Sequence, residues 1–231
     1  WYLCEWKANR QMYPPIKKQF GCISFDKGGY YCIREKDTFS FIRCGRHKDR
    51  PAHADNLHLD IWYQGENCLF DGGSYKYNTT EKLLRYFMGT ESHNTIMLEG
   101  HDQMLKGDRF IWYNWSQAEW SSLKETEDTY IFEGKVSCFT YLNKKIKHYR
   151  KIVKWKNTCK WEIEDCIDGN PKNMNMRQLW HTNKDNLSLE SNGETIDTEQ
   201  LCSNYYGQTT KCRQIEFQTK NSSIKTILQF I

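Results

Sequence analysis

Apolar and polar residues alternate along most of the chain. In residues 57–63 the odd positions are apolar, while His58 and Asp60 lie between them. The same period of two recurs in residues 130–142, 146–155, 160–167 and 223–230. Turn sequences rich in Gly, Asn and Asp separate such stretches, at residues 26–29, 64–67, 168–170 and 191–193. Because alternate side chains of a strand point to opposite faces of a sheet, the pattern predicts an all-β fold, a large and mostly antiparallel β-sandwich.

One segment departs from this period. Residues 79–88 offer a Thr that can cap the N-terminus of a helix, and Gly89 stands just past the end. We therefore expect one short helix near residues 80–88. Neither an internal repeat nor a linker is visible, and residues 170–173 are interpreted as a loop. The whole chain, residues 1–231, is expected to form a single domain.

Composition and charge indicate which kinds of binding partner the chain can have. Only 38% of the residues are hydrophobic but 15% are aromatic, so the aromatic side chains must supply much of the buried area. The net charge is +4, and the basic residues are spread along the chain, which argues against a nucleic-acid partner. A polyanionic glycan is compatible with this charge without being predicted by it. No apolar run is long enough for a membrane span.

The cysteines and the first residue bear on the compartment. The ten cysteines are scattered and form no CxxC pair, which argues against a thiolate zinc site and favours free thiols in a reducing, cytoplasmic compartment. The chain begins at Trp1, without an initiator Met or a leader. We interpret it as a piece of a longer polypeptide, whose other part could carry an export signal.

Three polar motifs follow one another within about fifty residues of strand-like sequence. They are Ala52-His53-Ala54-Asp55, Asp71-Gly72-Gly73-Ser74-Tyr75 and His93-Asn94-Thr95. Strand ends that converge could bring His53, Asp71 and His93 together, and two imidazoles with a carboxylate suit a divalent metal, most naturally zinc. The spacing alone is weak, since an isolated His beside a strand is more often structural. Asp55 and His58 are candidates to hold the remaining imidazole N–H groups.

These motifs resemble those of the heparinase II/III-like C-terminal domain of polysaccharide lyases. That family shows an (A/S)HAD box, a D-x-G-(T/S)-Y turn and an HNT box followed by a Gln, here Gln103. The resemblance implies a metal on the positions of His53, Asp71 and His93. It also implies β-elimination of uronic-acid polysaccharides, a cleft shared with an N-terminal α/α-toroid domain, and work in the bacterial cell envelope or periplasm.

The chain departs from the family at one catalytic position. The family has a His two residues before the first metal ligand, and this chain has Pro51, which can neither accept nor donate a proton. Four side chains are candidates to take over that role: His47, Tyr75, Tyr77 and Tyr86. The ordinary alternatives are an exposed loop His and aromatic packing.

Two function classes remain open at this point. The chain is either the metal-binding domain of a lyase for acidic glycans or a carbohydrate-binding or structural sandwich linked to exopolysaccharide processing, which Pro51 favours. Candidate substrate-binding residues are Arg50, which could pair with a carboxylate, and Trp112 and Trp115, which could stack on sugars. We expect the isolated chain to show little lyase activity, because β-elimination needs an aligned base and acid.

Overall fold

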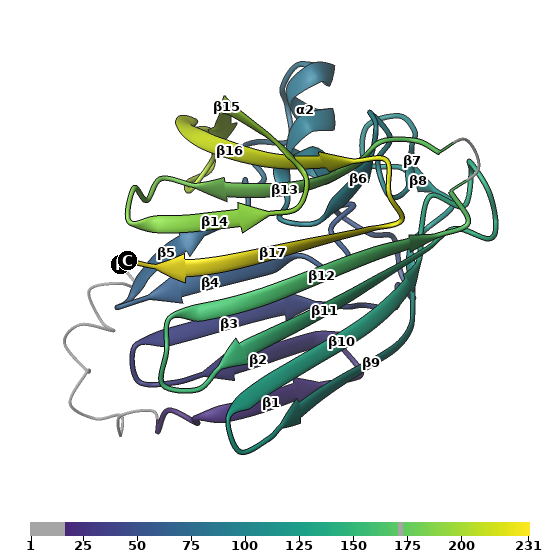
Figure 1. Ribbon diagram of the computed structural model, residues 1–231. Coiled ribbons are helices and arrows are strands. Elements are labelled where there is room, and N and C mark those ends of the chain that lie inside the picture. Colours follow the sequence, from purple (N-terminus) through teal and green to yellow (C-terminus); the bar gives the residue numbers. More distant parts are fainter. Residues whose placement is uncertain (1–16, 171–172) are drawn as a thin grey trace.

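The computed structural model describes residues 17–170 and 173–231, and its regular secondary structure is almost entirely antiparallel strands. Five strands form the first sheet in the order β1-β2-β3-β4-β5 (Figure 1). Their bounds are β1 Gly21–Phe25, β2 Tyr30–Arg34, β3 Thr38–Arg43, β4 Leu59–Tyr63 and β5 Glu66–Leu69. The alternation of apolar side chains therefore specifies strands, as predicted.

A second sheet of six strands faces the first one (Figure 1), in the order β14-β17-β12-β11-β10-β9. Its long strands pair in sequence order as hairpins, which is why the turn sequences separate them so regularly. The bounds are β9 Gln117–Glu125, β10 Thr129–Ser137, β11 Lys147–Trp155, β12 Lys160–Asp168, β14 Leu187–Ser191 and β17 Ser223–Phe230.

The remaining strands and the helix lie at one end of this sandwich (Figure 1). A four-stranded sheet has the order β15-β16-β13-β6, and β7 pairs with β8. The bounds are β6 Ile96–Leu98, β7 Leu105–Lys106, β8 Trp112–Tyr113, β13 Met176–Thr182, β15 Glu194–Cys202 and β16 Thr210–Thr219. The helix α2, Glu81–Met88, begins after Thr80, whose hydroxyl accepts a hydrogen bond from the Leu83 N–H, and ends just before Gly89. A 3-10 turn, η2 (Thr90–Ser92), follows it.

The main core lies between the two large sheets. Leu59 and Ile61 of β4 and Phe132 of β10 are fully buried within one apolar cluster. Trp161 is also fully buried, and its indole N–H donates to the hydroxyl of Ser40 on β3 at 2.9 Å, so it joins the two sheets. Large aromatic side chains thus supply much of the buried area, as the composition predicts.

One detail differs from the sequence-based prediction. The strand expected over residues 130–142 ends at Ser137, because Phe139 adopts a left-handed φ of 52° and its N–H bonds to Gln103 O instead of to a ladder. The turn expected at residues 191–193 is present, between β14, which pairs with β17, and β15, which pairs with β16. It carries the chain from one sheet to another.

The cysteine expectation can be compared with the described residues. Nine cysteines are free there, as their scattered spacing predicts. Cys4 and the strand-like stretch that begins at Trp1 lie outside the described residues, and so do residues 171 and 172 of the loop expected at residues 170–173. Within the described ranges, no helix is both long and apolar enough to cross a membrane.

Candidate metal centre

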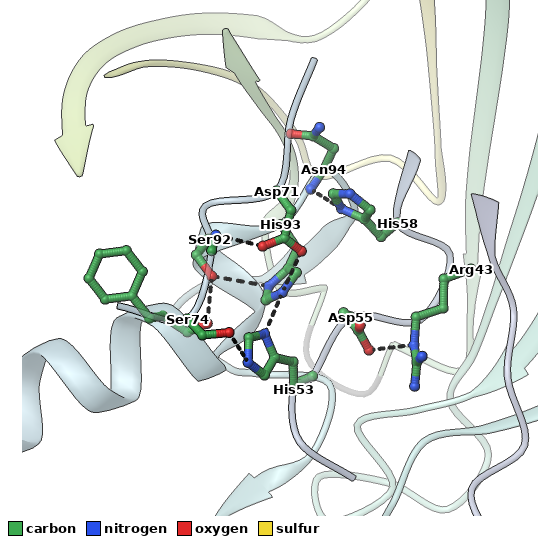
Figure 2. Close-up of polar contacts among 12 residues, drawn as sticks. Arg43, His53, Asp55, His58, Asp71, Ser74, Ser92, His93 and Asn94 are labelled. Carbon is green, nitrogen blue, oxygen red and sulfur yellow. Dashed lines mark hydrogen bonds and ion pairs between the residues drawn. The ribbon is translucent and has the colours of Figure 1, made fainter. Parts of the chain in front are cut away.

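Three segments that are distant in sequence bring His53, Asp71 and His93 together. His53 lies in the loop before β4, Asp71 follows β5, and His93 follows η2 and precedes β6. One ligating atom of each residue lies within 4.8 Å of the others. His93 Nε2 is 3.1 Å from His53 Nδ1 and 3.2 Å from an Asp71 carboxylate oxygen (Figure 2).

The second nitrogen of each imidazole has its own partner, which leaves the first nitrogen to face the cluster. His93 Nδ1 is 2.7 Å from the Gly89 carbonyl and therefore carries the proton it donates, so Nε2 presents a lone pair in the neutral ring. His53 Nε2 lies 3.3 Å from the Ser74 hydroxyl, which leaves Nδ1 for the cluster. A tetrahedral zinc with bonds of about 2.0–2.1 Å separates its ligands by roughly 3.3 Å. The residues present therefore fit a metal.

Electrostatics within the cluster point the same way. Burial opposes a charge on His93, but the Asp71 carboxylate outweighs it and raises the pKa of His93 to about 9. Burial would raise the pKa of Asp71, yet the charge and hydrogen bond of His93 hold it well below its ordinary value. Burial and the neighbouring His93 lower the pKa of His53. The site therefore favours a positive charge at its centre, whether a proton or a cation.

The turn that carries Asp71 is held by close backbone contacts. The Gly73 N–H donates to an Asp71 carboxylate oxygen at 2.6 Å, and Gly73 forms an isolated parallel β-bridge with Ser203. Gly73 has a φ of +85°, and a Cβ added there would lie 2.1 Å from the Ser203 carbonyl oxygen. Only glycine allows this approach.

We expect Gly73→Ala to weaken zinc binding about 10-fold or more, because the Asp71 turn must move away from Ser203. Gly65→Ala is the matched control, since Gly65 has a φ of +84° but no atom within 4 Å of an added Cβ. Both variants carry a left-handed alanine, which costs roughly 1–2 kcal/mol. Zinc titrations of the two proteins separate the effects, and equal affinities would contradict the role given to the turn.

A buried polar network supports the three ligand-bearing segments from behind. The Asn94 side-chain amide donates to Leu59 O at 3.0 Å and to Phe70 O at 3.2 Å, next to Asp71. Arg150 on β11 donates from one terminal NH2 group to Leu57 O at 2.6 Å and to Asn94 O at 2.7 Å. Because these contacts join the segments that carry all three ligands, they fix the ligands relative to one another.

The sequence suggests Asp55 and His58 as partners for the two imidazoles, but both residues have other polar partners in the structure. Asp55 forms an ion pair with Arg43 at 2.8 Å (Figure 2). His58 accepts a hydrogen bond from the Asn94 N–H at 2.9 Å and lies 3.2 Å from Asp60. Hydrogen-bonding groups on nearby turns take the expected place instead, namely Gly89 O and the Ser74 hydroxyl. Ser74 belongs to the motif Asp71-Gly72-Gly73-Ser74-Tyr75, so the sequence could have suggested it. The Gly89 carbonyl belongs to the backbone and could not be recognised from the sequence.

Beside His53 lies a small cavity of about 180 Å³, to which two of the other candidate residues contribute. Tyr77 is 66% exposed, and its ring packs edge-on against Phe110. Arg50 also lines the cavity, with its guanidinium carbon 5.5 Å from the Phe110 ring centre. Ser74 also lines the cavity, and its hydroxyl lies 3.3 Å from His53 Nε2. Through His53 and Ser74 this cavity adjoins the cluster.

The remaining candidates lie elsewhere. Tyr75 packs against Phe87, and Tyr86 donates its hydroxyl to Leu201 O at 2.8 Å. His47 is half-buried and does not line the cavity beside His53. Trp112 is only 2% exposed and donates its indole N–H to Ala52 O, so neither ring face is open to a sugar. Trp115 is partly buried and packs against a small apolar cluster of Ala54, Met88, Met104 and Trp112.

Comparisons with known proteins agree with this architecture. The family model described as "Heparinase II/III-like, C-terminal" matches residues 18–229. Among solved structures, a heparinase III with methylated lysines matches with a TM-score of 0.77 and 16% identity, over 100% of this chain and 41% of that chain. Heparan sulfate lyase HepC from Pedobacter heparinus matches with a TM-score of 0.76 and 15% identity, over 97% of this chain and 38% of that one. A search of curated proteins found no match.

Proposed function

This chain belongs to the family of heparinase II/III-like C-terminal domains, and on that premise we propose that it is the metal-binding β-sandwich of a polysaccharide lyase. The observation that supports the proposal is the convergence of His53, Asp71 and His93, whose possible ligating atoms all lie within 4.8 Å of one another. The chain spans about two fifths of the length of the solved lyases it resembles. We propose that an N-terminal helical domain completes the active site.

Zinc is the metal we propose for this centre. Two imidazole nitrogens and one carboxylate oxygen are ligands that zinc accepts, and they leave a fourth position free. When bound, the ion supplies a positive charge and ties three segments together. The positive charge of the ion would also attract an anionic sugar to the neighbouring cavity.

The proposed reaction is β-elimination on a uronic-acid glycan. A base removes the C5 proton, the C4–O bond breaks, and the departing oxygen takes up a proton, which leaves an unsaturated sugar. Arg50 is placed to pair with the uronate carboxylate, since a guanidinium can bind it through two hydrogen bonds. Tyr77 is the candidate for proton transfer on this chain, because its ring lies exposed in the same cavity.

A non-catalytic role is the second candidate, and one observation favours it. Pro51 lines the cavity beside His53 at the position where the family has a His, so this chain lacks that proton-transfer group. In that case the metal only joins the strands, and the domain binds carbohydrate during exopolysaccharide processing. For either role we propose the bacterial cell envelope or periplasm, and cell fractionation distinguishes this from the cytoplasm.

Metal content and turnover together test the proposal. We expect the purified protein to contain close to one zinc per chain and the double variant His53→Ala, Asp71→Asn to contain almost none. Lyase activity is followed through the ultraviolet absorbance of the unsaturated product with heparan sulfate or alginate. We expect weak turnover by this chain alone and a gain of at least 10-fold with the N-terminal domain present, because a base and an acid must act on one sugar.

Each outcome of this experiment has a distinct reading. Unchanged zinc in the double variant would remove the metal centre. No turnover in any form of the protein, with zinc present, would favour the carbohydrate-binding role. Turnover that survives Tyr77→Phe would exclude Tyr77 as the proton-transfer group.

A further inference from the structure

The outer face of the five-stranded sheet carries a second site, which we propose binds an acidic oligosaccharide. The site lies at the β4–β5 turn, while the ligand-bearing segments join the opposite ends of these two strands. It shares no residue with the metal centre or with the cavity beside His53. It therefore goes beyond the proposed function and does not depend on it.

An exposed aromatic floor is the first observation. Trp62 on β4 is 38% exposed and stands directly opposite Phe39 on β3, with both side chains on the face turned away from the core. Arg34 on β2 lies opposite Phe39 in turn, and its guanidinium carbon is 4.1 Å from the centre of the Phe39 ring. These three side chains line a groove of about 310 Å³, near the lower end of the roughly 300–1,000 Å³ typical of ligand sites.

The charge of the groove is the second observation. Lys18, Arg34 and Lys36 line it, and within the described part of the chain none of the three forms an ion pair. Two acidic residues also line the groove, Glu35 and Asp37. The net charge that the groove offers to a ligand depends on whether these two carboxylates already pair with other groups of the protein.

Glu35 is engaged by the protein itself. Its carboxylate accepts a hydrogen bond from the fully buried Lys154 ammonium at 2.7 Å and another from the Asn157 N–H at 2.9 Å, and its side chain is only 14% exposed. Asp37 is then the one remaining carboxylate opposite three cations. The groove therefore combines an apolar ring surface with an excess of positive charge.

This combination specifies the class of ligand. The C–H face of a pyranose ring can pack on the Trp62 indole, and Arg34 can pair with a carboxylate or sulfate on the same or the next sugar. Stacking on Phe39 already orients the Arg34 guanidinium, which reduces the entropy lost on binding. A neutral sugar would use only the ring and leave the cations unpaired. The occupant is thus an acidic oligosaccharide.

Binding of a heparin-derived hexasaccharide, measured by calorimetry, tests the proposal. The measurement uses the His53→Ala, Asp71→Asn background, so that failure of the metal centre does not affect it. We expect Trp62→Ala and Arg34→Gln each to weaken binding at least 10-fold, and raised salt to weaken it further. Both side chains lie at the surface, and thermal unfolding verifies that each variant is folded.

Trp155→Ala is the matched control. Trp155 is 37% exposed on the other large sheet and also has a cation near its ring, with the Lys160 ammonium 5.7 Å from the ring centre. We expect this variant to bind as tightly as its parent. Absence of binding by the parent, equal loss in the Trp155 variant, or equal binding of cellohexaose or a DNA duplex would each overturn the proposal.

Discussion

Asp165→Ala is expected to lower the free energy of unfolding by about 3–5 kcal/mol, the cost of leaving a buried charge without its partner. Asp165 and Arg150 are both fully buried between the sheets. The carboxylate accepts two hydrogen bonds from Arg150, at 2.7 and 2.8 Å, one from His148 at 2.6 Å and one from Gln178 at 2.7 Å. Removal of this acceptor leaves all of these buried donors without a hydrogen-bond partner.

Asp168→Ala is the control on the same strand. Asp168 is 65% exposed and pairs with Lys135 at 3.1 Å, and an exposed ion pair contributes at most about 1 kcal/mol. Urea unfolding of the two variants measures the difference. A loss below about 1 kcal/mol in the Asp165 variant would contradict the view that this network holds the core together.

The same network explains why the inward face of β11 could not be predicted. The period of two is correct, but the buried side chains are His148, Arg150, Ile152 and Lys154, so three of the four are ionisable. A pattern that assigns polar residues to solvent chooses the other face, which carries Tyr149 and Val153. Strand period is local, whereas the choice of face here depends on partners such as Asp165 that only the folded chain brings into contact.

The three candidate metal ligands were easier to foresee than their surroundings. His53, Asp71 and His93 stand at strand ends in motifs that a sequence displays, and antiparallel pairing brings such ends together. The groups that orient them are partly backbone, such as Gly89 O and the Gly73 N–H, and partly remote, such as Arg150. Backbone groups have no residue identity, and nothing in the spacing relates Arg150 to Asn94.

Zinc is expected to raise the free energy of unfolding by about 4 kcal/mol when its free concentration is 1,000 times the dissociation constant. For a domain of this size, that corresponds to a rise of roughly 8–16 °C in Tm. The reason is that the folded chain holds His53, Asp71 and His93 together, while the unfolded chain binds the ion far more weakly.

Thermal unfolding with and without zinc, and again after a chelator, measures the effect. His53→Ala is expected to lose nearly all of the zinc-induced rise. His101→Ala should keep it, because His101 lies outside the cluster and its ring contacts Tyr141. A zinc-induced rise that persists in the His53 variant would mean that the ion binds elsewhere. An absent rise in the unmodified protein would mean that a proton on His93, held by Asp71, already satisfies the site.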